Sequence, residues 1–290
     1  MTRIVETLAE ISQPYDVLLC DLWGCVHDGI RPFPAAVAAL QKFRAGGGTV
    51  ILVTNAPRQR SAVQAQLDRM DLPRDSYDDI ASSGDAARAA MYRGAAGEKV
   101  WFMGEPHDEV FFEPMQLIEN PVEITRVPLD EAEGIICTGP FDPLANPADL
   151  RPHLLYAKQK GLKLLCANPD LVVDRGEVRE WCAGEIARIY TEMGGESLYF
   201  GKPHPAIYDL ARARLAALGI APDNSRILAV GDGIHTDIQG ALGEDIDSLF
   251  VTGGLAADET KTSQQPDPAA LDAFIQREMV TPTYASGFLR

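Results

Sequence analysis

The chain has 290 residues, a formal net charge of −16 at pH 7 and a sequence pI near 4.7. This acidic balance argues against nucleic acid or an anionic membrane surface as a partner, and no apolar run approaches the roughly 18 residues that a membrane-spanning helix needs. The five cysteines show no CxxC spacing, which argues against a zinc cluster or a redox pair, so we expect reduced thiols and a cytoplasmic location.

Short apolar runs rich in β-branched residues alternate along the chain with longer amphipathic stretches. This alternation predicts parallel strands joined by right-handed helical crossovers, and therefore an α/β protein with open parallel sheets. The predicted strands are residues 17–20, 49–53, 99–102, 134–137, 163–166, 197–200, 226–230 and 248–251. The predicted helices are residues 34–45, 61–70, 84–93, 149–160, 183–193, 205–218, 236–244 and 267–279. The length favours two domains.

Residues placed directly after the predicted strands are the first candidates for a functional site. In open α/β sheets, ligands bind beyond the carboxyl ends of the strands. The candidates are Asp21, the pair Thr54-Asn55, the segment Asn168-Pro169-Asp170, the segment Gly201-Lys202-Pro203, and residues 231–237 with the sequence GDGIHTD.

Asp21 and Asp232 each follow an apolar strand. If the two strands belong to one sheet, both carboxylates can converge on one hard cation, and Mg²⁺ favours such oxygen ligands together with substrate phosphate. The alternative is that each aspartate only caps the helix that follows it, since Asp is a favoured N-cap residue.

Three further residues could bind an anion. Thr54 and Asn55 stand where the chain turns toward a helix N-terminus, so a hydroxyl, an amide and backbone N–H groups could contact phosphate. Lys202 precedes a helix opened by Pro205 and could pair with both a phosphate and the Asp21 carboxylate. The simpler alternatives are an ordinary strand-to-helix turn and a solvated lysine.

The order of these residues is more specific than any one of them. Asp follows the first strand, Thr follows the next, Lys precedes a helix, and GDxxxTD follows a later strand. This set resembles the haloacid dehalogenase superfamily, most of whose members transfer phosphoryl groups through an aspartyl-phosphate. The long insertion between VTNAPR and GKPHP, with HDG at 27–29, ANPD at 167–170 and GDGIHTD at 231–237, is similar to subfamily IIA, the NagD-like phosphatases.

The resemblance implies a fold and a division into domains. The fold is a doubly wound, Rossmann-like α/β core with an inserted α/β cap. The core would comprise residues 1–82 and 184–290, and the cap, of the kind that subfamily IIA carries, residues 83–183. Cap-mediated dimers are common in the subfamily, so a homodimer stays open.

The resemblance also assigns roles, in a Mg²⁺-dependent phosphatase that acts on a small phosphorylated metabolite. Asp21 is the nucleophile, and Thr54 and Lys202 bind phosphate, with Asn55 beside them. Asp232 binds Mg²⁺, and Asp237 supports the outer shell of the metal. The residue at position 23 contributes its backbone carbonyl to the metal.

Trp23 departs from the pattern of the superfamily, because most of its phosphatases carry DxD where this chain has Asp21-Leu22-Trp23. The second Asp protonates the leaving oxygen and then activates water. An indole N–H is only a donor and does not ionise in a useful range, so Trp23 cannot act as general acid and base. Its backbone carbonyl is unaffected by the substitution.

Three interpretations of Trp23 stay open. In the first, a phosphatase takes its proton from Asp28, His27 or His235, or uses a leaving group that needs none; for Asp28-Gly29 we favour a turn. In the second, the protein is a carbon–halogen hydrolase, although such enzymes lack the metal aspartate that this chain keeps at Asp232. In the third, it binds a phosphorylated metabolite without turnover.

Two more residues are candidates for substrate recognition. Arg58, near the start of the helix after Thr54, could hold a distal anionic end of a substrate, or could be solvated. Asp170 is a candidate for binding a substrate hydroxyl or amine, by resemblance only.

Overall fold

A computed structural model describes residues 2–115, 118, 120–175 and 178–290. The chain divides into two compact units. Unit 1 contains the residues up to Thr54, Gln64–Ala81 and Tyr208–Arg290, and unit 2 contains Asn55–Val63 and Ser82–Ile207. Among the described residues, no helix combines the length and the apolar character that crossing a membrane requires.

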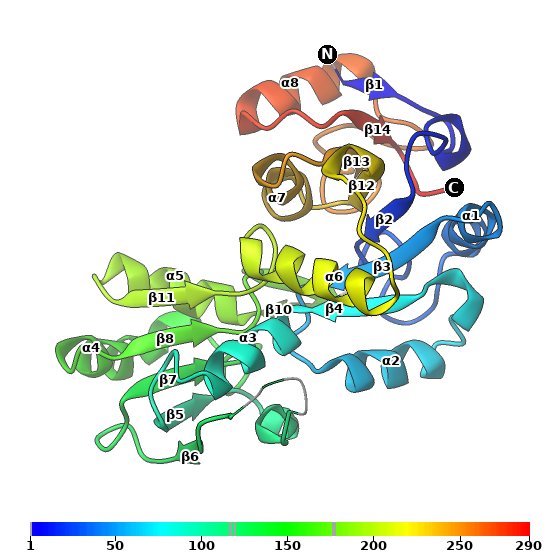
Figure 1. Cartoon of the computed structure of the whole chain (residues 1–290). Coiled ribbons are helices and arrows are strands. Elements are labelled where there is room, and N and C mark those ends of the chain that lie inside the picture. The colour runs from blue at the N-terminus through cyan, green and yellow to red at the C-terminus, as the bar shows by residue number, and fades with distance from the viewer. Residues whose placement is uncertain (1, 116–117, 119, 176–177) are drawn as a thin grey trace. The chain divides into compact units, whose positions relative to one another are not determined.

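Unit 1 is built on a seven-stranded sheet with the order β1-β14-β13-β12-β2-β3-β4 (Figure 1). The pairings from β1 through to β3 are all parallel. The strands are β1 (Arg3–Ile4), β2 (Val17–Cys20), β3 (Thr49–Thr54), β4 (Asp79–Ser82), β12 (Ile227–Gly231), β13 (Asp247–Val251) and β14 (Tyr284–Ser286). The helices that connect them are α1 (Pro34–Ala45), α2 (Arg60–Arg69), α6 (Pro205–Ala217), α7 (Gln239–Gly243) and α8 (Pro268–Glu278).

The strand order of unit 1 reverses between β2 and β12. From β2 the chain moves outward to β3 and β4, and from β12 it moves outward in the opposite direction to β13 and β14. Because crossovers between parallel strands are right-handed, the two runs place their helices on opposite faces of the sheet. In doubly wound proteins, ligands bind beyond the carboxyl ends of the strands at such a reversal of strand order, which here lies between β2 and β12.

Unit 2 contains a parallel five-stranded sheet with the order β11-β8-β7-β5-β6 and an antiparallel pair, β9 and β10. The strands are β5 (Lys99–Met103), β6 (Thr125–Arg126), β7 (Gly134–Cys137), β8 (Lys163–Cys166), β9 (Val172–Arg175), β10 (Val178–Trp181) and β11 (Glu196–Tyr199). The helices are α3 (Ser83–Tyr92), α4 (Arg151–Gln159) and α5 (Ala183–Glu192).

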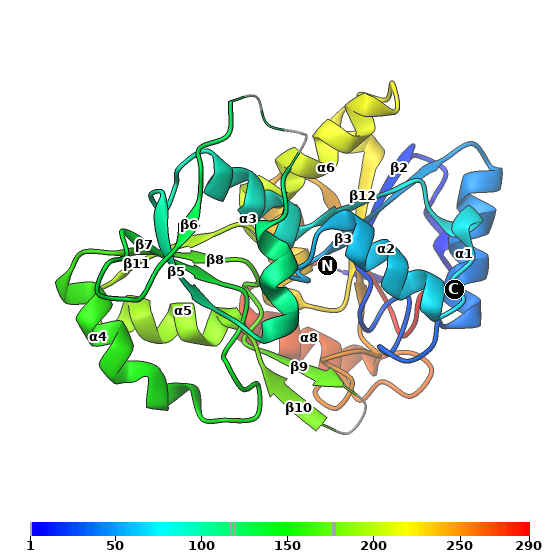
Figure 2. The same cartoon turned by 90° about the horizontal axis from the view of Figure 1, so that it is seen from below.

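Alternate residues of the central strands of unit 2 face two separate cores. In β7, Ile135 packs with side chains of α4 and α5, whereas its neighbour Ile136 packs with side chains of α3. Leu164 and Leu165 of β8 are divided in the same way. Figure 2 shows α3 on the opposite side of the five-stranded sheet from α4 and α5. Burial on both faces explains why these strands read as continuous apolar runs.

The boundary of the insertion differs from the prediction. The predicted cap ends at residue 183, but unit 2 continues to Ile207 because β11 pairs with β8 and α5 packs on that sheet. Unit 2 also takes in residues 55–63. This segment is held by hydrogen bonds from the Gly84 N–H to the Ala56 carbonyl (3.0 Å) and from Ser82 Oγ to the Arg58 carbonyl (2.7 Å).

The predicted elements are otherwise found. All eight predicted strands form within one residue of the expected bounds, and the α/β class with a doubly wound sheet is confirmed. In the described part of the chain, six strands were not predicted: β1, β4, β6, β9, β10 and β14. The predicted helix 236–244 begins instead as a π-helical turn over Ile234–Ile238, followed by the short α7.

Candidate active site

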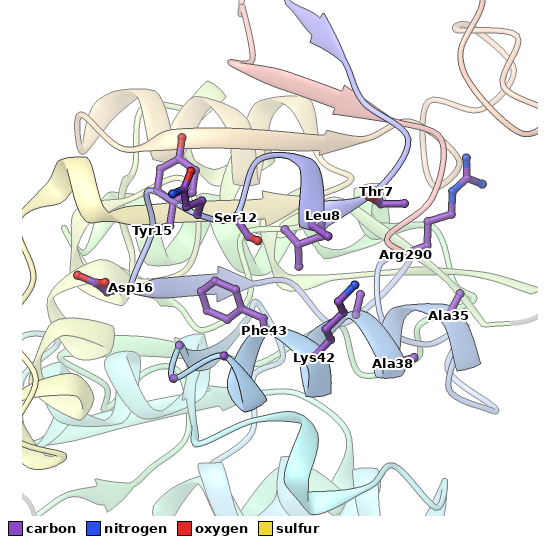
Figure 3. A pocket seen from close by; sticks show the side chains of 16 residues that line it. Thr7, Leu8, Ser12, Tyr15, Asp16, Ala35, Ala38, Lys42, Phe43 and Arg290 are labelled. Carbon is purple, nitrogen blue, oxygen red and sulfur yellow. The ribbon is translucent and has the colours of Figure 1, made fainter.

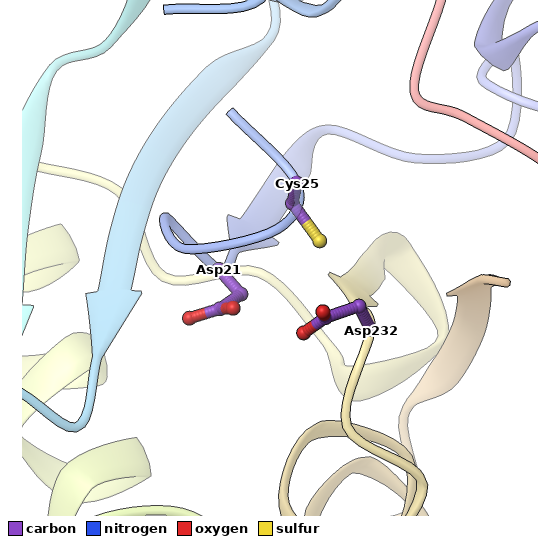
Figure 4. Close-up of side chains that lie close together, drawn as sticks. All are labelled: Asp21, Cys25 and Asp232. Carbon is purple, nitrogen blue, oxygen red and sulfur yellow. The ribbon is translucent and has the colours of Figure 1, made fainter. Parts of the chain in front are cut away.

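Two buried carboxylates meet in unit 1 at the reversal of strand order. Asp21 follows β2, and its backbone N–H donates to the Val230 carbonyl of β12 at 2.8 Å, which fixes the start of the loop. Asp232 follows β12. One carboxylate oxygen of each aspartate and the Cys25 sulfur all lie within 4.8 Å of one another (Figure 4). The prediction that Asp21 and Asp232 converge is therefore confirmed.

Two glycines allow the Asp232 carboxylate to sit in this position. A Cβ atom on Gly24 would lie 2.1 Å from Asp232 Oδ2, and one on Gly254 would lie 2.0 Å from the same atom. Gly24 also has φ near +74°, a conformation that side chains other than glycine rarely adopt. The Leu255 N–H donates to Asp232 Oδ2 at 3.1 Å. The loops after β2 and β13 thus fix where this carboxylate points.

If the phosphatase activity that the resemblance implies depends on Asp232, Gly24→Ala should lower its turnover about 10²-fold, because the new methyl group displaces the Asp232 carboxylate by an ångström or more. Steady-state assays of purified variants measure this. Gly47→Ala is the matched control, since Gly47 also has a positive φ (+93°) but has no atom within 4 Å of its ideal Cβ. Gly47→Ala should lower the free energy of unfolding by about 1–2 kcal/mol and leave turnover unchanged. Equal losses in both variants would show that backbone strain, not contact with Asp232, is responsible.

The chemistry of this cluster fits a hard divalent cation. Two carboxylates that face each other in a buried site repel, and a cation between them removes that repulsion. Burial raises the pKa of the Cys25 thiol, and the charges of Asp232 and Asp21 raise it further. The thiol therefore stays protonated beside two oxygen donors, and an oxygen donor set of this kind suits Mg²⁺.

Asp237 organises the turn after β12. Its Oδ2 atom accepts hydrogen bonds from the Gly233 N–H (3.1 Å) and the Thr236 hydroxyl (3.3 Å). A Cβ on Gly231 would lie 2.1 Å from the Asp237 carboxyl carbon, so the glycine is needed for this approach. These contacts hold the turn that carries Asp232.

Asn55, Asp170 and Lys202 form a cluster within unit 2. The Asn55 side-chain nitrogen donates to Asp170 Oδ1 (2.8 Å) and to the Lys202 carbonyl (3.1 Å), and its oxygen accepts from the Lys202 N–H (2.7 Å). The side-chain amide of Asn55 is therefore engaged in holding the backbone of Lys202, so any phosphate contact from this residue would come from its backbone. Lys202 is only 4% exposed, which argues against a solvated lysine.

Arg58 lies beside a histidine of unit 2. Its Nη2 atom is 3.4 Å from His107 Nε2, and His107 lies 3.3 Å from the Asp108 carboxylate. The Arg58 backbone is packed against Gly84, where a Cβ would lie 2.4 Å from the Arg58 nitrogen. Arg58 is thus placed by its backbone, and the residue is partly exposed.

The side chains proposed as substitute proton donors for Trp23 are engaged in other ways. Burial lowers the pKa of His27 to about 4, so the imidazole is neutral at pH 7, and its Nδ1 accepts from the Gly29 N–H at 3.0 Å. Asp28 accepts from the Ile30 and Arg31 N–H groups, which lower its pKa, and so forms the expected turn. His235 Nε2 lies 2.7 Å from Glu278.

The Trp23 ring is packed within its own loop. It packs edge to face against the His27 ring, with 5.3 Å between the ring centroids, and a Cβ on Gly29 would lie 2.5 Å from the indole. The HDG segment thus provides a small residue against which the indole lies.

Two parts of the candidate site were not predicted from the sequence: Cys25 and the segment after β13. Cys25 was read only as a reduced thiol, because cysteine spacing does not reveal a neighbour that comes from another strand. The segment Thr252-Gly253-Gly254 stands directly after a predicted strand, so the rule that found Asp21 could also have found it. Gly254 and Leu255 both contact Asp232.

A surface pocket of unit 1 lies elsewhere (Figure 3). It is lined by the chain before β2, by α1 and by Gly46, Gly47 and Gly48 before β3, together with Arg290. These loop residues precede the strands, so the pocket lies at their amino ends. Asp21 follows the carboxyl end of β2, and the pocket is therefore separate from the carboxylate pair.

Comparisons with known proteins identify the family. A family model described as haloacid dehalogenase-like hydrolase matches residues 18–117, and a second described as HAD-hydrolase-like matches residues 199–274. The solved structure of a haloacid dehalogenase-like hydrolase from Brucella suis 1330 is 35% identical, covers 99% of this chain and 100% of that one, and has a TM-score of 0.85. The chain therefore belongs to the haloacid dehalogenase-like family of hydrolases.

Other similar proteins include phosphatases. D-glycerol 3-phosphate phosphatase of Mycobacterium tuberculosis is 27% identical over 98% of this chain and 72% of its own length. A glycerol phosphate phosphatase from that organism, solved in complex with magnesium, shares the fold at 24% identity and a TM-score of 0.66, with 97% of this chain and 77% of that one covered. These comparisons confirm the predicted superfamily, and they are consistent with its NagD-like subfamily. They also confirm the predicted class of enzyme, a phosphoric monoester hydrolase.

Proposed function

We propose that this hydrolase removes phosphate from a small phosphorylated metabolite, with Asp21 as the nucleophile. The observation that carries the proposal is the convergence of two buried carboxylates, Asp21 and Asp232, from neighbouring strands at the reversal of the sheet order. A pair of carboxylates that bind one cation and flank a phosphoryl group suits in-line transfer, in which the protein chiefly positions and neutralises charge.

Asp21, Asp232 and the backbone carbonyl of Trp23 are the groups that would hold Mg²⁺ in this proposal. When bound, the cation would neutralise charge on the phosphate oxygens and fix the orientation of the phosphoryl group. The neutral thiol of Cys25 is a poor donor for such a hard cation.

The chain's own residues carry out the two steps. A carboxylate oxygen of Asp21 attacks phosphorus, the bond to the leaving oxygen breaks, and an aspartyl-phosphate forms while the leaving oxygen takes a proton from solvent. Water then attacks phosphorus, and the Asp21 carboxylate and inorganic phosphate are released. Thr54, the Asn55 backbone and Lys202 are assigned to the phosphate oxygens, where a buried lysine supplies a positive charge in a chain whose formal net charge is −16.

Asp170 and Arg58 are assigned to the rest of the substrate. The Asp170 carboxylate suits a hydroxyl or amine donor, and Arg58 suits a distal anion. A relative at 27% identity acts on D-glycerol 3-phosphate, so short polyol phosphates are the first substrates to assay.

Phosphate release from a panel of phosphorylated metabolites and from p-nitrophenyl phosphate, with Mg²⁺ and with EDTA, tests the proposal. We expect release that requires Mg²⁺ and returns when Mg²⁺ is restored. Release that is equal with and without the metal would contradict the proposal. Tight binding without release would indicate a binding protein, and halide release from 2-chloropropionate in EDTA would indicate a carbon–halogen hydrolase.

A further inference from the structure

Cys25 brings a sulfur atom to the carboxylate pair. The loop that carries it is closed by hydrogen bonds from the Val26 N–H to the Leu22 carbonyl (2.8 Å) and from the Gly24 N–H to the His27 carbonyl (3.0 Å). Cys25 is 1% exposed, and Figure 4 shows its side chain directed toward the Asp232 carboxylate. The thiol thus occupies a fixed position beside both aspartates.

We propose that Asp21, Asp232 and Cys25 together form a binding site for soft, thiophilic divalent cations such as Cd²⁺ and Zn²⁺, which compete there with Mg²⁺. The inference rests on the cation site of the proposed function and adds a ligand that Mg²⁺ does not use. Its three donor atoms, two oxygens and one sulfur, belong to buried residues and lie within 4.8 Å of one another.

The choice between cations follows from the donor atoms. Oxygen ligands suit Mg²⁺, whereas thiolate ligands select softer metals, and Zn²⁺ accepts mixed sulfur and oxygen sets with a Zn–S distance of about 2.3 Å. Binding forms a metal–sulfur bond and breaks the S–H bond of Cys25, and the proton passes to the buffer. The two carboxylates keep their charge, so with the Cys25 thiolate the site that holds the divalent ion carries one net negative charge.

Titration of the full-length, metal-free protein with Cd²⁺ tests the inference by ultraviolet difference absorption, because a cadmium–thiolate bond has a charge-transfer band that a cadmium–carboxylate bond lacks. We expect one equivalent of Cd²⁺ to produce the band and release a proton, and excess Mg²⁺ to reduce it. In Cys25→Ser the band should disappear, and the affinity for Cd²⁺ should fall about tenfold or more. Cys25→Ala serves as a second variant, and circular dichroism checks that each is folded.

Cys182→Ser is the matched control, because Cys182 is also a buried free thiol but belongs to unit 2. It should keep the full band. An unchanged band in folded Cys25→Ser, or no band in the wild-type protein, would overturn the inference. Failure here is distinct from failure of the proposed function: Mg²⁺-dependent phosphate release without a cadmium–thiolate band would remove only the role of Cys25.

Discussion

Asp21→Asn is expected to lower Mg²⁺-dependent phosphate release on the order of 10⁴-fold or more, as removal of a nucleophile does in other hydrolases. An amide cannot form the aspartyl-phosphate, and it also removes one of the two charges that hold the cation. A continuous phosphate-release assay on the best substrate measures the loss, and mass spectrometry of trapped wild-type enzyme should detect phosphate on the peptide that contains Asp21.

Asp28→Asn is the matched control for this substitution. Asp28 lies in the same loop, and an asparagine oxygen can accept the same hydrogen bonds from Ile30 and Arg31. Its turnover should stay close to that of the wild-type protein. If Asp21→Asn kept wild-type turnover, or if both variants lost it equally, Asp21 would not be the nucleophile.

Trp23→Asp is expected to change which leaving groups the enzyme can expel. Without a general acid at position 23, the wild-type protein should turn over p-nitrophenyl phosphate far faster than glycerol 3-phosphate, whose alkoxide leaves poorly. A carboxyl group at this position supplies the missing proton, and general acid catalysis contributes about 10²–10⁴-fold. The ratio of kcat/KM for p-nitrophenyl phosphate to kcat/KM for glycerol 3-phosphate should therefore decrease about 10²-fold in Trp23→Asp.

Trp23→Asn separates proton transfer from loss of the indole. Asparagine has nearly the same shape as aspartate but cannot donate a proton as an acid, and it leaves the same space beside His27 and Gly29. If the ratio decreased equally in both variants, the indole ring, rather than the absence of a carboxylate, would be what slows the hydrolysis of substrates with poor leaving groups.

Much of the fold could be predicted because local patterns decide it. Runs buried on both faces, such as Ile135–Cys137 in β7, are apolar throughout and are therefore legible in one sequence. The short strands β1 and β6 carry no such pattern. Their position is set by pairing with distant segments, β14 and β5, rather than by their own residues.

The end of the insertion could not be predicted for the same reason. Residues 197–200 are predicted as a strand, but nothing in their composition says which sheet they join. The structure pairs β11 with β8 of unit 2. A helix followed by a strand has the same sequence pattern whether the unit belongs to the core or to the inserted domain.

The candidate site divides along similar lines. Asp21 and Asp232 could be predicted because each directly follows a clearly apolar strand. Ligands of open α/β sheets bind beyond the carboxyl ends of the strands, which places the two residues in one site. The use of the Asn55 amide to hold Lys202, and the approach of Gly24 to Asp232, depend on contacts across the chain that spacing does not encode.

The placement of β12 beside β2 has a consequence for synthesis of the protein. The two aspartates that meet at these strands are separated in sequence by the whole of unit 2, so a ribosome releases one half of the proposed cation site long before the other. Such distant pairings form late in folding because the intervening chain must first be ordered. A nascent chain that ends before β12 therefore lacks Asp232, one of the two aspartates of the proposed cation site.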